Sequence, residues 1–288
     1  MLYTIKNDKI TAKISDMGAE LVSVVKDGCE YIWVGTADFW SGHAPIVFPI
    51  CGRLYESKYT YRGKEYDMNI HGFLRHSVLT VTEHTDTEIC FKLTESEETK
   101  KKYPFDFELK VWFILEGDKI TNRFEIKNTG KDVLPATIGG HPGFNVPLDK
   151  GNFDDYYLEF ENECSPDKFV FSERYLLKGK VGYPLEKGKI IRLCHSFFDD
   201  DATFLSRADS TVTLKSDKTE RFVKVIYPDM PYLGIWHKPM SEAPYVCIEP
   251  WCGLPGNDGV IEDMELRADM FRIQPSSTKK VEFSMIFG

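Results

Sequence analysis

Apolar and polar residues alternate with a period of two over much of the chain, and this pattern predicts half-buried β-strands. The segments that show it are Ile10–Ser15, Leu21–Val25, Glu30–Val34, Leu79–Thr82, Glu88–Thr94, Val212–Ser216, Phe222–Tyr227, Tyr232–Trp236, Tyr245–Ile248 and Val281–Ile286. The clearest hairpin joins Phe107–Leu115 to Lys119–Asn128 through the turn Glu116-Gly117-Asp118.

A helical pattern is scarce. Only Glu95–Lys102 has the composition of a helical turn, and Pro104 would end it. The chain has no Pro/Gly/Ser-rich linker, no repeat of fixed period and no low-complexity tract. Many short strands separated by turn residues are typical of a sandwich or barrel. We therefore expect an all-β protein, a large antiparallel β-sandwich with long loops that forms a single domain over residues 1–288.

The net charge of the chain excludes some classes of binding partner. The 288 residues carry 36 Lys and Arg against 45 Asp and Glu, a formal net charge of −9. Such a chain lacks the basic surface that binds nucleic acid or an anionic membrane. Its seven cysteines show no C-x-x-C spacing, and its first residues lack the pattern of a secretory signal. We expect a cytoplasmic protein with free thiols.

Four segments interrupt the alternation and concentrate ionisable residues: Pro49–Leu54, Asn69–His76, Gly139–Asn145 and Cys247–Trp251. His141 has two glycines before it and Pro-Gly after it. Such glycines let the backbone approach a ligand closely, but they also suit an ordinary tight turn. Glu249 follows an apolar run, so its carboxylate is either paired with an arginine or acts as a general base with Trp251 as a wall.

The other candidates also have two interpretations. His71 and Arg75 could lie in a surface turn, and Arg53 could be a salt-bridge partner. Asp199-Asp200-Asp201 has the composition of a solvated acidic loop, and no EF-hand spacing surrounds it. Nucleotide-binding and serine-hydrolase motifs are absent. Residues of these types on separate loops favour proton transfer on a polar, uncharged or weakly anionic substrate.

The four segments, in this order and on this β-rich background, resemble the aldose 1-epimerase (galactose mutarotase) family, most closely its LacX-like branch. The resemblance runs from Met17-Gly18-Ala19-Glu20-Leu21 to the last strand. It implies a large β-sandwich with an open sugar cleft and an isomerase that needs neither cofactor nor metal.

The resemblance also implies roles for individual residues. Glu249 matches the catalytic base and His141 the catalytic acid. Arg53 and His71 match residues that bind the ring oxygen and hydroxyls of the sugar. Asp201 lies where the family has a hydroxyl-binding Asp, with Asp199 and Asp200 as neighbouring alternatives. Trp236 stands where galactose mutarotases have a polar amide side chain.

Some positions depart from the galactose mutarotases. Leu54, Pro142 and Pro250 replace residues that usually follow the arginine, the histidine and the glutamate. Arg75 matches an arginine that helps bind phosphate in hexose-6-phosphate mutarotases. We therefore expect a hexose mutarotase first, a hexose-6-phosphate mutarotase second, and a carbohydrate-binding protein without catalysis third. Its partner would be a sugar or sugar phosphate, and the protein a monomer or homodimer.

Overall fold

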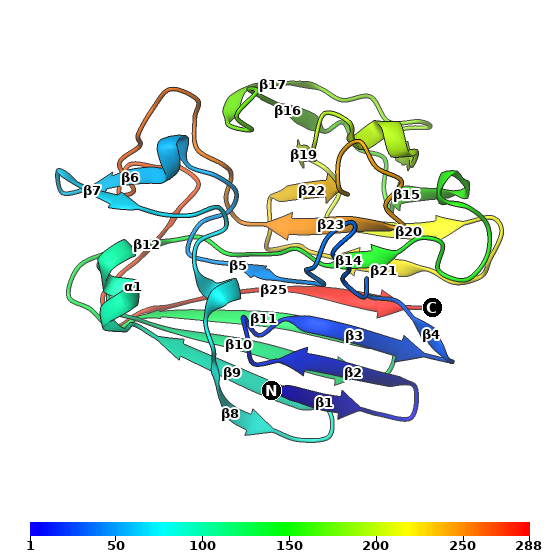
Figure 1. Ribbon diagram of the computed structural model, residues 1–288, viewed down its shortest axis with the longest axis horizontal. Helices are drawn as coiled ribbons and strands as arrows, with labels where there is room; N and C mark the ends of the chain where they lie inside the picture. The colour runs from blue at the N-terminus through cyan, green and yellow to red at the C-terminus, as the bar shows by residue number, and fades with distance from the viewer.

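The structure is a computed structural model that describes all 288 residues. Strands account for 47% of the chain and helices for 7%. Nearly every strand pairing is antiparallel (Figure 1). These features confirm the predicted all-β sandwich.

Three large sheets and two small ones make up the fold. The nine-stranded sheet has the order β18 (Ile190–Arg192), β15 (Tyr156–Phe160), β20 (Thr211–Ser216), β21 (Val223–Ile226), β25 (Thr278–Phe287), β11 (Lys119–Asn128), β10 (Phe107–Glu116), β9 (Glu88–Thr94), β8 (Thr80–His84). The eight-stranded sheet has the order β17 (Leu177–Gly182), β16 (Asp167–Phe171), β19 (Thr203–Ser206), β22 (Tyr232–Trp236), β23 (Tyr245–Trp251), β13 (Gly139–Gly140), β5 (Ile46–Val47), with β14 (Gly143–Asn145) also paired to β23. The four-stranded sheet contains β1 (Leu2–Lys6), β2 (Ile10–Ser15), β3 (Leu21–Lys26) and β4 (Cys29–Glu30).

The remaining elements are two separate strand pairs and a few short helices. Two pairs of strands stand apart: β6 (Lys58–Tyr61) with β7 (Lys64–Asp67), and β12 (Leu134–Ala136) with β24 (Phe271–Ile273). The helices are α1 (Glu97–Lys102) and four short 3-10 turns, η1 (Tyr55–Ser57), η2 (Leu74–His76), η3 (Phe153–Asp155) and η4 (His195–Phe198).

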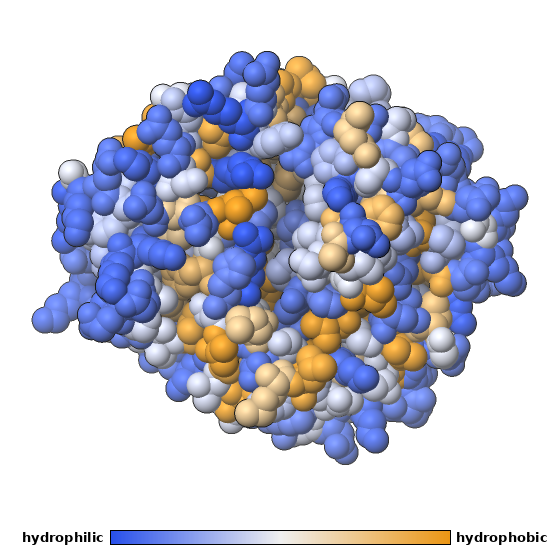
Figure 2. Space-filling view, in the orientation of Figure 1, coloured by the Kyte–Doolittle hydropathy of each residue, from blue (hydrophilic) through white to orange (hydrophobic).

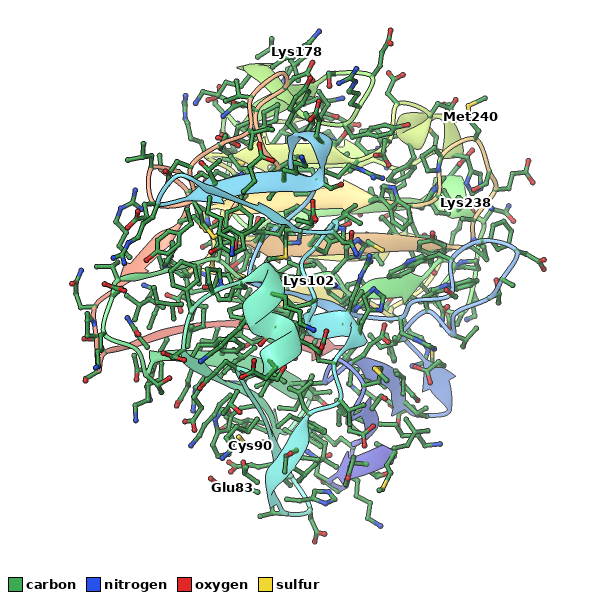
Figure 3. All side chains as sticks on the ribbon, turned by 60° about the vertical axis from the view of Figure 1, so that its left-hand side comes forward. Glu83, Cys90, Lys102, Lys178, Lys238 and Met240 are labelled. Carbon is green, nitrogen blue, oxygen red and sulfur yellow. The ribbon has the colours of Figure 1, made fainter.

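The nine-stranded sheet forms one layer of the sandwich, and the other two large sheets cover it (Figure 1). The four-stranded sheet lies over β8–β11, where Tyr3 of β1 contacts Phe91 of β9 at 5.7 Å between ring centroids. Figure 3 shows Lys178 of β17 and Cys90 of β9 at opposite ends of the molecule. One cluster of 64 buried residues, contributed by all three large sheets, forms the core between the layers.

Strand β23 has both faces buried, and the two faces serve different purposes. Val246 and Ile248 belong to the main core. Cys247 and Trp251 point to the other side, into two smaller clusters. Because side chains alternate along a strand, Glu249 lies on the same outer face as these two residues. The outer face of the eight-stranded sheet therefore carries the carboxylate.

Most predicted strands are confirmed. Ile10–Ser15, Glu88–Thr94, Lys119–Asn128 and Tyr232–Trp236 have the predicted bounds, and most of the others differ by one or two residues at an end. The strand predicted over Glu30–Val34 is present only in part, since β4 ends at Glu30 and beyond it Ile32 forms an isolated bridge with Phe144. The Glu30 carboxylate accepts hydrogen bonds from the backbone N–H groups of Val24 and Ile32, at 2.8 and 3.0 Å. These bonds occupy the groups that a continuing ladder would use.

The predicted helical turn is also confirmed, two residues shorter at its start. Ser96 caps α1 by accepting a hydrogen bond from the N–H of Thr99, whose hydroxyl accepts one from the N–H of Ser96 in return. The helix ends at Lys102, ahead of Pro104. No helix in the structure is long and apolar enough to cross a membrane.

Candidate active site

A pocket of about 220 Å³ opens on the outer face of the eight-stranded sheet. Figure 2 shows this face of the molecule hollowed near its centre, in the region where Figure 1 draws β22 and β23. All seven site residues expected from the sequence line the pocket: Arg53, His71, Arg75, His141, Asp201, Trp236 and Glu249. The fold thus brings together residues from six separate segments of the chain.

Glu249 lies within β23, not beyond the end of an apolar strand as the sequence suggested, because the strand continues to Trp251. It pairs with Gly234 of β22. A Cβ atom added to Gly234 would lie 3.1 Å from the Cβ of Glu249 and 2.6 Å from the ring of Phe204. The absence of a side chain at Gly234 therefore leaves space for the side chain of Glu249. Glu249 is only 2% exposed.

His141 is held beside β23 by strand pairing before and after it. Gly139 pairs with Trp251 and Gly143 with Cys247, so this register places His141 opposite Glu249 on the neighbouring segment. The backbone N–H of His141 also donates to the carbonyl of Pro45 at 3.0 Å. As a result, His141 Nε2 lies 3.3 Å from Glu249 Oε1. The other ring nitrogen, Nδ1, is buried without a hydrogen-bond partner.

Burial acts on both members of this pair. It raises the pKa of Glu249 well above its ordinary value, and the nearby Asp201 carboxylate adds to the effect. It also lowers the pKa of His141 to about 3, with a further contribution from the positive charge of Arg75. Both shifts favour the neutral form, with one proton on Glu249 and none on Nε2. In these forms the carboxyl group and the unprotonated Nε2 face each other across the 3.3 Å contact.

His71 presents a hydrogen-bond donor to the pocket. It lies in a turn with φ of +64°, and its Nδ1 accepts a hydrogen bond from the N–H of Gly52 at 3.2 Å. Burial, reinforced by the positive charges of Arg75 and Arg53, lowers the pKa of His71 well below its ordinary value. A neutral imidazole that accepts at Nδ1 carries its proton on Nε2.

Arg53 and Arg75 line the pocket without a carboxylate partner, since neither forms an ion pair within 4 Å. The carbonyl of Arg53 accepts a hydrogen bond from Gly256 N–H at 2.7 Å, and its guanidinium lies 5.5 Å from the ring centre of Tyr175. Arg75 comes from η2, and its Nε donates to His76 Nε2 at 3.1 Å. The sequence-based alternative of an ordinary salt bridge for Arg53 is therefore wrong.

Asp201 is the member of the acidic triplet that lines the pocket, whereas Asp199 and Asp200 are exposed. Its Oδ1 accepts a hydrogen bond from Trp236 Nε1 at 2.7 Å. Burial raises the pKa of Asp201, opposed by this hydrogen bond and by the charge of Arg53. A backbone hydrogen bond from Ala202 also lowers this pKa, and the carboxylate faces the pocket, where it can accept a hydrogen bond from a hydroxyl.

Sequence reasoning missed Trp40 and Tyr175, which also line the pocket. The ring of Trp40 lies 5.1 Å from that of His141 and 5.6 Å from that of Trp236. Lys238, which follows β22 (Figure 3), holds the Trp40 loop through a hydrogen bond from Nζ to the carbonyl of Asp38 at 2.8 Å. The only local signal was an aromatic pair, Phe39-Trp40, in a stretch rich in Gly and Ser.

One group of side chains here has the composition of a metal site. Donor atoms of His141, Cys247 and Glu249 all lie within 4.8 Å of one another, and all three residues are buried. Cys247 had no role in the sequence-based analysis. A buried thiol thus lies close to His141 and Glu249, which line the pocket.

Comparisons with known proteins identify the family of the chain. The model of the aldose 1-epimerase family matches residues 1–261. The plasmid-encoded protein LacX of Lactococcus lactis subsp. lactis is 33% identical over 297 residues, covering 99% of both chains. A galactose mutarotase related enzyme from Lactobacillus acidophilus is 35% identical, with a TM-score of 0.96 over 100% of this chain and 97% of that chain. A galactose mutarotase-like protein from Lactobacillus casei is 30% identical, with a TM-score of 0.95 over 100% of both chains. The chain therefore belongs to the aldose 1-epimerase family.

Proposed function

We propose that the protein interconverts the α and β anomers of a free hexose by acid/base ring opening, with Glu249 as the base and His141 as the acid. The observation that carries this proposal is the 3.3 Å contact between His141 Nε2 and Glu249 Oε1 at the base of the pocket. In a pyranose, the anomeric oxygen O1 and the ring oxygen O5 are bonded to the same carbon, C1. An acid and a base that serve these two oxygens must therefore be close neighbours.

The proton inventory of the pair suits this reaction. Ring opening takes the O1 proton onto the Glu249 carboxylate and delivers the His141 proton to O5 while the C1–O5 bond breaks and the C1 carbonyl forms. The pair then holds one proton, on Glu249, which is the neutral form that burial favours. Rotation about C1–C2 and ring closure with both transfers reversed give the other anomer. The neutral pair thus corresponds to the open-chain stage.

The cyclic sugar needs the other arrangement of the same proton. A transfer from Glu249 to His141 across their contact produces the carboxylate and imidazolium without exchange with solvent. We expect activity to fall on both sides of an intermediate pH, because a second proton removes the base and loss of the shared proton removes the acid. A flat rate between pH 4 and pH 10 would contradict the assignment.

Hydrogen-bond donors beside His141 and Glu249 would stabilise the negative charge that develops on the ring oxygen. We assign this role to His71, through its Nε2–H, and to Arg53, which has no carboxylate partner. Fixed donors in a site with little water stabilise an oxygen that becomes negative as its bond breaks. We assign sugar contacts to Asp201, through its carboxylate, and to the aromatic faces of Trp236 and Trp40.

Anomer exchange measured by proton NMR at equilibrium tests the proposal, with galactose, glucose and their 6-phosphates as substrates. We expect enzyme-dependent exchange on a free hexose. Glu249→Gln removes the base with almost no change of shape, so it should reduce exchange by a factor of about 10²–10⁴ and retain sugar binding. Glu242→Gln, at an exposed position before β23, is the matched control. Retained exchange in Glu249→Gln would refute the assignment.

A specific observation favours a second candidate, a hexose-6-phosphate mutarotase. Beside the main pocket lies another of about 410 Å³, and the two share Arg53, Ile70 and Arg75. Arg174 and His76 also line it, together with one acid, Glu56. Three arginines without carboxylate partners form a local positive region that suits a phosphate, despite the net charge of −9. Exchange confined to a 6-phosphate, abolished in Arg75→Gln, would establish this candidate in place of the first.

The third alternative is a carbohydrate-binding protein without catalysis. Binding alone does not require an acid and a base 3.3 Å apart in a buried position, where both are costly to desolvate. Sugar binding without exchange on any of the four sugars would favour this alternative over the first two.

A further inference from the structure

A nitrogen, a sulfur and an oxygen donor converge where His141 and Glu249 line the pocket. One ligand atom each of His141, Cys247 and Glu249 lies within 4.8 Å of the other two. The thiol of Cys247 is 0% exposed and forms no hydrogen bond in the structure. Acid/base chemistry uses the other two groups and leaves this thiol without a role.

The backbone holds these donors in place. Cys247 and Glu249 are two residues apart in β23, so both project from its outer face. Cys247 is paired with Trp236 on one side of the strand and with Gly143 on the other. Glu249 is paired with Gly234. The pairing of β14 with β23 also fixes the position of His141, which lies two residues before Gly143. The three donors therefore come from a rigid part of the sheet.

The donor set matches the preferences of zinc. Zn²⁺ binds imidazole nitrogen and carboxylate oxygen at about 2.0–2.2 Å and thiolate sulfur at about 2.3 Å in tetrahedral geometry, which requires donor separations of about 3.4–3.6 Å. The His141–Glu249 distance is already 3.3 Å. Because all the donor pairs lie within 4.8 Å, a shift of about 1.2 Å or less brings the set to these separations. The pocket supplies a path of entry and an open fourth position.

We propose that His141, Cys247 and Glu249 form a zinc-binding site, and that Zn²⁺ bound there blocks the pocket as a reversible inhibitor. Zinc binding itself follows from the donor geometry alone. The inhibitory effect rests on the proposed function, because the ion would occupy both the acid and the base and lie where C1 of the sugar must bind.

A second group of donors provides the natural control. His195 Nδ1 and His237 Nε2 are 3.2 Å apart and joined by a hydrogen bond, and Cys194 precedes them. The sulfur of Cys194 contacts the hydroxyl of Ser196 at 3.4 Å. Cys194→Ser thus removes a thiol near two histidines without touching the pocket.

The first experiment measures binding by titrating the purified, metal-free protein with Co²⁺ and with Zn²⁺. We expect one ion per chain and, with Co²⁺, a thiolate-to-metal absorption band in the near ultraviolet that excess Zn²⁺ removes. Cys247→Ser should abolish the band, Glu249→Gln should weaken binding, and Cys194→Ser should change neither. Absence of the band in the wild type, or its loss in Cys194→Ser only, would overturn the site. Unfolding midpoints of the variants establish that each is folded.

The second experiment measures anomer exchange as Zn²⁺ is added and then removed with EDTA, each variant being compared with its own rate without zinc. We expect inhibition that EDTA reverses, that higher sugar concentration relieves, and that needs at least tenfold more Zn²⁺ in Cys247→Ser. Zinc binding without inhibition, or activation by zinc, would overturn the inhibitory role. If the protein showed no exchange at all, the proposed function would fail while the cobalt titration still decided the zinc site.

Discussion

Replacement of Glu249 by glutamine tests the electrostatics of the site through stability as well as through activity. Glutamine has nearly the shape of a protonated glutamic acid, and its amide group can face His141 Nε2 as the carboxyl group does. It cannot ionise. The difference in the free energy of unfolding between Glu249→Gln and wild type therefore isolates the titration of one buried carboxyl.

The sign and the size follow from linkage. Burial raises the pKa of Glu249 in the folded protein above its ordinary value of 4.5. The stability that Glu249 contributes is thus fully present below pH 4.5 and is lost as the pH rises to the folded pKa, because only the unfolded chain releases its proton in that range. One proton corresponds to about 1.4 kcal/mol per pH unit. Glu249→Gln should gain this amount on the wild type for each unit, until the folded pKa is reached.

Urea unfolding at half-unit steps from pH 5 to pH 8 measures this difference, and other titrating groups largely cancel between the two proteins. The pH at which the difference stops growing is the folded pKa of Glu249. Glu242→Gln, at an exposed position, should show no such trend. A constant difference across the range would mean that Glu249 is already ionised at pH 5, and would refute a neutral His141–Glu249 pair.

Three further predictions concern the surroundings of the pair. Gly234→Ala places a methyl group 2.6 Å from an aromatic ring, so it should cost about 1–3 kcal/mol and reduce exchange; Gly179→Ala, whose methyl meets nothing within 4 Å, should leave the urea midpoint nearly unchanged. Arg267→Met removes a buried cation from two partly buried carboxylates, and should cost about 3–5 kcal/mol in urea unfolding. A loss below 1 kcal/mol would contradict this. Trp40→Ala uncovers His141, so the acid limb of the pH–rate profile should move to higher pH, and an unmoved limb would show that Trp40 does not shield the imidazole.

Strand positions could largely be predicted because alternation is a local property. A strand with one face in the core needs apolar residues at every second position, and β9 and β11 show this pattern with the predicted bounds. The prediction failed where a side chain competes for backbone groups, as Glu30 does. It was too short at β23, where both faces are buried and alternation no longer marks the end.

Most residues of the candidate site could also be predicted from the sequence, but two could not. The expected residues all line one pocket, and the sequence motifs that carry the family resemblance located them. Trp40 and Cys247 escaped because their relevance depends on which ring lies above His141 and which face of β23 is outermost. Neither property leaves a signal in the neighbouring residues.

The sequence by itself determined the class of fold, through alternating strands and glycines at turns, and the types of side chain available for chemistry. Only the tertiary structure decided that His141 and Glu249 touch, that burial shifts the pKa of each toward its neutral form, and that a thiol lies beside them. The contact arises from pairing of β13 and β14 with β23, strands far apart in the chain. The protonation follows from burial by all the layers around the pocket, because the cost of desolvating a charge depends on everything that replaces water and not on its neighbours in sequence.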